Sequence, residues 1–166
     1  MGRFNSIEER VLFSPDVPAP VNALLQAAVA ASRCDETEAE RLFIEARRLD
    51  CHCLDTYFAL YKFYFYRARL ADAEQAALAG LEEAARQGRF PADYKRLARE
   101  KEKWNLYANG ITHFYLYSLK ALAFIKLRSG QDAEARVILS VISDLDPEDR
   151  SGVSVISDLA SALEQE

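Results

Sequence analysis

The sequence has few of the residues that mark a secreted, membrane-embedded or disulfide-stabilised protein. Its 166 residues include three cysteines, an odd number too small for a disulfide scaffold, which predicts a reducing compartment. No apolar run reaches the length of about 18 residues that a membrane-spanning helix needs. Glu8 and Glu9 stand where a signal peptide would require an uninterrupted apolar core. We therefore expect a soluble, cytoplasmic protein without a membrane partner.

Catalytic and metal-binding patterns are also missing. The sequence contains no glycine-rich phosphate loop, no Ser-His-Asp ordering and no His-x-x-x-His or Glu-x-x-His pair. Cys34 and the Cys51-His52-Cys53 run could in principle supply zinc ligands. The predicted helix at 37–49 would separate Cys34 from that run by roughly 20 Å, too far for one ion. We predict no enzyme, no cofactor and no metal site.

The two histidines leave one chemical alternative open. His52 could act as a base for a neighbouring cysteine, although adjacent side chains on one helix or turn do not normally face each other. His113 begins an aromatic helical segment and is expected to be structural.

An excess of acidic residues limits the classes of partner. The formal net charge is −5 and the isoelectric point is about 5.2, which argues against a nucleic-acid binder that neutralises phosphates. Half of the residues are hydrophobic, enough for the core of one domain. A local basic segment, 93–103, holds five basic and three acidic residues. It is interpreted either as a solvated helix or as a basic face for a partner.

What the chain does contain is helical periodicity. In 118–147, Leu122 and Ala123 begin one apolar face, Gly130 interrupts it, and a second face follows until Asp146-Pro147 ends the pattern. This pattern predicts two helices joined by a short turn. The second face consists of Ala135, Leu139 and Ile142.

Similar faces occur upstream. One consists of Ala39, Phe43 and Ala46, and another of Ala73, Ala77 and Gly80. Ala39 and Ala73 lie 34 residues apart, and Ala73 and Ala135 lie 62 apart, which is one such period plus 28 residues. The extra residues fall near 88–111. A further short helix is predicted at 6–13, where Ser6 and Glu9 form a capping box.

The chain resembles the tetratricopeptide repeat family, whose pattern recurs about every 34 residues. Tyr57, Leu60 and Tyr64 match the large, leucine and tyrosine positions of that pattern, and Tyr61 replaces its small residue. Cys51 stands where the family has proline. The resemblance implies an all-α fold: a right-handed superhelical stack of about three helix hairpins with an inserted helix and a C-terminal capping helix. The single domain, 1–166, would hold repeat units at about 20–52, 54–87 and 112–147, an insertion at about 88–111 and a cap at 150–164.

The same resemblance implies a binding face, because the first helix of each pair lines a concave groove in this family. The second unit would contribute Asp55, Phe58, Lys62, Phe65 and Tyr66, and the third would contribute Tyr117, Lys120, Phe124, Leu127 and Arg128. The first unit would offer a smooth wall of Val21, Leu24, Ala28, Ala31 and Ser32. Such an aromatic groove with three cations suits a peptide with apolar anchors and some acidic residues. Burial of Phe58 and Phe65 in the core is the alternative.

The sequence thus predicts a protein–protein interaction adaptor or chaperone-like scaffold that binds a partner protein or peptide by contact alone. Three-repeat acidic chains of this length also resemble type III secretion chaperones, which is one alternative. A homo-oligomerising regulatory or structural module, such as a homodimer, is another.

Overall fold

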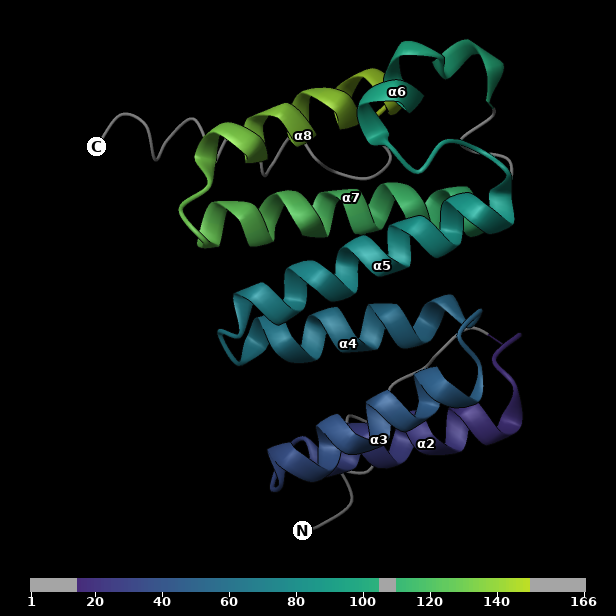
Figure 1. Cartoon of the computed structure of the whole chain (residues 1–166), viewed down its shortest axis with the longest axis vertical. Helices are drawn as coiled ribbons and strands as arrows, with labels where there is room; N and C mark the ends of the chain where they lie inside the picture. The colour runs from purple at the N-terminus through teal and green to yellow at the C-terminus, as the bar shows by residue number, and fades with distance from the viewer. Residues whose placement is uncertain (1–14, 105–109, 150–166) are drawn as a thin grey trace, which may run out of the picture.

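The computed structural model describes residues 15–104 and 110–149, and this part of the chain is all-helical, as predicted (Figure 1). The short helix expected at 6–13 and the cap expected at 150–164 lie outside the described residues. The elements are α2 (Ala19–Ala31), α3 (Glu36–Leu49), α4 (Leu54–Tyr66), α5 (Leu70–Gly88), α6 (Tyr94–Arg99), a 3₁₀ turn η1 (Lys101–Lys103), α7 (Gly110–Arg128) and α8 (Asp132–Leu145).

The helix boundaries follow from local sequence. Pro20 stands in the first turn of α2, where its missing N–H costs nothing. The Asp35 carboxylate accepts a hydrogen bond from the Glu38 N–H at 3.1 Å and so caps α3. Gly130 has a φ of 75°, which turns the chain between α7 and α8 and favours a residue without Cβ.

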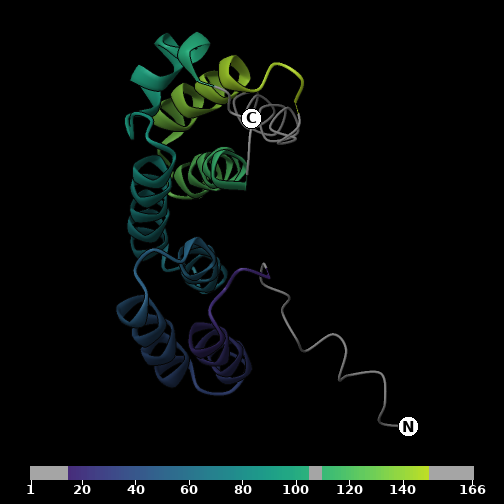
Figure 2. The ribbon, with the colours of Figure 1, turned by 90° about the vertical axis from the view of Figure 1, so that its right-hand side faces the viewer.

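The helices pair in chain order and the pairs stack. Helix α2 packs against α3, α4 against α5 and α7 against α8, while α3–α4 and α5–α7 contacts join successive pairs. Figure 2 shows the resulting arc, in which α2, α4 and α7 lie along the concave side and α3 and α5 along the other. This order brings α4 and α7 together although 43 residues separate Tyr66 and Gly110.

The predicted apolar faces form the core of these contacts. Ala39, Ala73, Ala77, Ala135 and Ile142 have no exposed surface. Gly80 marks the closest approach: a Cβ placed there would lie 3.0 Å from the Tyr57 Cβ and 3.4 Å from the Phe114 ring. Small residues on α5 therefore allow α4 and α7 to pack close to it on either side.

The segment 93–103 forms less helix than its charge pattern predicts. Helix α6 ends at Arg99, and η1 follows as a separate turn. Leu97 is the one fully buried residue of α6, so the segment has no apolar stripe long enough to stabilise several turns against the core. Instead, α6 lies across α8 (Figure 1).

Specific side chains connect the helix pairs. The Phe43 and Phe63 rings lie 5.2 Å apart between α3 and α4. Arg69 of the α5 N-cap forms an ion pair of 2.6 Å with Glu40, and this hydrogen bond lowers the pKa of the Glu40 carboxyl. Further along, the Tyr61 and Ser118 hydroxyls lie 3.3 Å apart where α4 meets α7. Each pair of helices is therefore fixed to its neighbour by both packing and polar contacts.

Candidate functional site

Helices α4 and α7 lie together on the concave side of the arc (Figure 2), and aromatic side chains of the two helices meet there. Tyr66 and Tyr117 are the most exposed of them, at 74% and 43%. Phe58, Phe65 and Phe124 are half-buried and pack against the core while keeping part of each ring at the surface. Phe58 and Phe65 therefore lie between the two alternatives, groove position and core position, because each is only partly buried.

The rings of the two helices are in contact. The Phe58 and Tyr117 centroids lie 6.0 Å apart, and those of Phe65 and Phe124 lie 5.3 Å apart. Both distances are within the range of attractive aromatic pairs. The structure therefore brings together five aromatic side chains predicted from two distant segments.

The three predicted cations lie over these rings. The Lys62 Nζ is 4.9 Å from the Phe58 centroid, the Lys120 Nζ is 5.4 Å from that of Tyr117, and the Arg128 Cζ is 5.7 Å from that of Phe65. Cation–π attraction contributes about 0.5–1 kcal/mol at exposed positions, enough to orient a long side chain. We call the five rings and three cations the aromatic strip: Phe58, Phe65, Tyr66, Tyr117, Phe124, Lys62, Lys120 and Arg128.

A hollow of about 150 Å³ borders the strip where α4 meets α2 and α3. Val29 and Arg67 contribute to it, although neither was predicted as a site residue. The Arg67 guanidinium donates to the Ser32 carbonyl and lies 4.1 Å from the Phe63 ring centroid. The hollow is lined by Val29, Ser32, Phe43, Phe58, Ala59, Lys62, Phe63, Tyr66 and Arg67.

The predicted contribution of α2 needs correction. Val21 and Ala28 are buried, at 1% and 0% exposure, and belong to the hydrophobic core. Of the predicted wall Ser32 lines the hollow, and Val29 lines it in place of Val21 and Ala28. A shift of one residue on a helix rotates a side chain by about 100°, and the alanine-rich sequence of α2 gave no contrast from which to choose the face.

Asp55 lies apart from the strip. It lines a second hollow of about 470 Å³ near the first turn of α4, together with Asp16, Asp50, His52 and Gln87. Leu127 is partly buried and packs against the core, so the aromatic strip contains eight of the ten residues predicted on α4 and α7.

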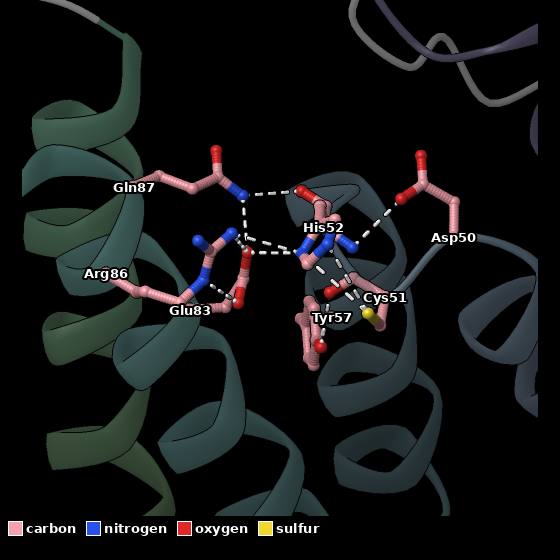
Figure 3. A network of polar contacts seen from close by, with 7 residues as sticks. All are labelled: Asp50, Cys51, His52, Tyr57, Glu83, Arg86 and Gln87. Atoms are coloured by element: carbon pink, nitrogen blue, oxygen red, sulfur yellow. Dashed lines mark hydrogen bonds and ion pairs between the residues drawn. The ribbon is translucent and has the colours of Figure 1, made fainter.

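The neighbourhood of His52 is a polar network between the α3–α4 turn and α5 (Figure 3). The His52 Nδ1 lies 2.9 Å from a Glu83 carboxylate oxygen, and Arg86 donates to the same carboxylate at 2.6 Å. Gln87 donates to the His52 carbonyl at 2.7 Å. Hydrogen bonds from Arg86, Gln87 and His52 lower the pKa of Glu83 to about 2. This network fixes the turn before α4 to the end of α5.

Cys51 is closer to His52 than the sequence suggested. The Cys51 Sγ lies 3.7 Å from the His52 Nδ1, because both residues belong to a turn rather than to a regular helix. That nitrogen already faces Glu83 and Arg86, as Figure 3 shows. Cys34 and Cys51 are exposed and Cys53 is buried, and all three are free thiols.

Within residues 15–104 and 110–149, no three His, Cys, Asp or Glu side chains are placed to hold a metal ion. No helix in the same ranges is long and apolar enough to cross a membrane.

Comparison with known proteins adds one relative. The chain is 28% identical over 135 residues to the "Uncharacterized 19.8 kDa protein in nifW 5'region" of Azotobacter chroococcum mcd 1, an alignment that covers 78% of this chain and 73% of the relative. No family model and no solved structure matches the chain. The relative's name records where its gene lies and no activity.

Proposed function

We propose that the chain is an adaptor or chaperone-like scaffold of tetratricopeptide-like architecture, which binds a partner polypeptide on the aromatic strip. The paired helices stacked in an arc and the 34-residue spacing between Ala39 and Ala73 support this architecture. Its mechanism is binding without a chemical step.

The observation that carries the proposal is the continuity of exposed aromatic surface across α4 and α7. Tyr66 and Tyr117 expose large apolar rings beside the half-buried Phe58 and Phe124. Contiguous exposed apolar surface is rare on monomers and marks interaction sites, and aromatic residues dominate the binding energy of such sites. The neighbouring cations supply orientation and faster encounter.

The test combines partner capture with site-specific cross-linking. A photoreactive residue replaces Tyr117 in the full chain, expressed in its native host, and the cross-linked protein is identified by mass spectrometry. Adding the double change Lys62→Ala with Tyr66→Ala to this photoreactive chain should reduce the yield of the adduct by about tenfold or more, because one cation and one exposed ring are lost. A partner adduct that is insensitive to this double change would contradict the proposed site.

The matched control is Arg48→Ala with Leu49→Ala, which also removes one exposed cation and one exposed apolar side chain, but from α3. It should leave the adduct unchanged. Circular dichroism melting should show both double variants folded. Cross-links that join two copies of the chain would support the homo-oligomeric alternative instead, and sedimentation at several concentrations would then show a dimer.

A further inference from the structure

The helices of the concave side differ in charge from the others. Helices α2, α4 and α7 carry one carboxylate, Asp55, and four cations: Lys62, Lys120, Lys126 and Arg128. Helices α3, α5 and α8 carry eleven carboxylates and five arginines. In a chain of net charge −5, the concave helices are therefore positive.

The cations also differ in their partners. On the convex side, Arg41 of α3, Arg69 at the α5 N-cap and Arg86 of α5 pair with Glu38, Glu40 and Glu83, all at 2.6–2.7 Å. Lys126 points to α5, where it pairs with Glu74. Among the residues that the structure describes, no carboxylate pairs with Lys62 or Arg128, and these cations lie over the faces of Phe58 and Phe65. Aromatic rings therefore hold these two charges in place, and no described carboxylate neutralises them.

The hollow beside Lys62 supplies an apolar subsite. Its volume of about 150 Å³ is suited to one large side chain, and Val29, Phe43, Phe58 and Phe63 form its apolar walls. Lys62 and Arg67 stand among its lining residues, so an apolar group inside it would lie next to positive charge. An acidic side chain beside such a group would meet Lys62 without having to displace an ion pair between described residues, whereas Arg67 already lies 3.8 Å from a Glu36 carboxylate oxygen.

From these three observations we propose that the strip recognises an acidic segment with one large apolar anchor. The anchor enters the hollow between α2 and α4, and the flanking carboxylates pair with Lys62 and Arg128. This inference rests on the proposed function, since it assigns the chemistry of the partner bound at the same site.

The probe is a fluorescein-labelled peptide of glutamates with one central leucine, titrated with the full chain and followed by anisotropy. One matched peptide replaces leucine by alanine and another replaces every glutamate by lysine. We expect binding of the leucine–glutamate peptide at about 0.1 M salt, strongly reduced at about 1 M, where the screening length falls from about 10 Å to about 3 Å. The alanine peptide should bind about tenfold or more weakly, and the lysine peptide should not bind.

Variants of the chain test separately the recognition of the acidic residues and the recognition of the apolar anchor. Lys62→Glu with Arg128→Glu should weaken the leucine–glutamate peptide about tenfold or more and create affinity for the lysine peptide. The control, Arg48→Glu with Lys95→Glu, makes the same charge change at exposed positions on α3 and α6 and should leave binding unchanged. Val29→Phe, which fills the hollow, should abolish the preference for leucine over alanine while keeping the preference for acid.

Equal binding of the acidic and basic peptides, or an effect of the control equal to that of Lys62→Glu with Arg128→Glu, would overturn the inference. Partner capture that still depends on Lys62 and Tyr66, but not on the charge at 62 and 128, would also overturn it while leaving the proposed function intact. Partner capture that depends neither on Lys62 and Tyr66 nor on the charge at 62 and 128 would reject the proposed function as well.

Discussion

The Glu83 carboxylate holds in place the turn that precedes α4, the first helix of the candidate site. It accepts hydrogen bonds from Arg86 and Gln87 and lies 2.9 Å from the His52 Nδ1, so it connects α5 to the turn that begins α4 (Figure 3). These donors stabilise the ionised form, which is why its pKa is about 2 instead of 4.5. Phe58, the first residue of the aromatic strip, follows about one helical turn after this polar network.

A consequence follows for stability against pH. A lowered pKa in the folded chain stabilises it above the unfolded value, and this contribution is lost as the pH falls from about 4.5 towards 2. Glu83→Gln should therefore lower the free energy of unfolding by about 1 kcal/mol at pH 7. The difference from the unmodified chain should shrink in acid, measured by urea unfolding at several pH values. Glu82→Gln, at the exposed neighbouring position, should change little at any of them; an equal effect would show that the network adds no stability.

At the scale of elements, the site depends on how closely α4, α5 and α7 approach one another. Gly80 of α5 faces Tyr57 of α4 and Phe114 of α7, and a Cβ there would already lie 3.0 Å from the Tyr57 Cβ. A larger side chain would push the two helices that carry the aromatic strip apart. Glycine fits this position although its helix propensity is about 1 kcal/mol less favourable than that of alanine.

Gly80→Leu should destabilise the fold by about 1–3 kcal/mol through overpacking, although leucine is the better helix former. Thermal melting provides the measurement. The matched variant Ala71→Leu places the same side chain at an exposed position on the same helix and should leave the melting temperature nearly unchanged. If the two variants melt alike, the close approach at Gly80 does not limit the packing.

At the scale of the whole molecule, each helix pair is in contact mainly with the next, so the pairs need not open together. The first pair joins the second through Phe43 against Phe63 and through Glu40 with Arg69. The hollow proposed for the apolar anchor lies at this junction. Partner binding there would stabilise the contact between the first two pairs.

Phe43→Ala should consequently loosen the first pair more than the last. The ring is 2% exposed, and its removal should cost about 3–5 kcal/mol. In hydrogen–deuterium exchange, amide protection should fall in α2 and α3 and remain higher in α7 and α8. Leu139→Ala, a buried change in α8, should give the opposite order. Uniform loss of protection in both variants would show a single cooperative unit.

The amino-acid pattern alone determined the helical class, the turns at Gly130 and Asp146-Pro147, and the apolar faces around Ala39, Ala73 and Ala135, because periodicity and capping act over a few residues. The resemblance to the repeat family, and not periodicity alone, indicated all eight residues of the aromatic strip as positions on groove-lining helices. It failed for Val21 and Ala28, where an alanine-rich helix has no distinct polar side.

Only the tertiary structure decided which rings meet and which charges form ion pairs. Phe58 meets Tyr117, and Phe65 meets Phe124, because the small residues of α5 allow α4 and α7 to converge, a relation between segments that local sequence does not encode. Ion pairing depends likewise on which carboxylate the fold brings near: within the described ranges Lys126 pairs with Glu74, and Lys62 pairs with no carboxylate. Residue spacing specifies faces, whereas contacts between faces depend on how the whole chain packs.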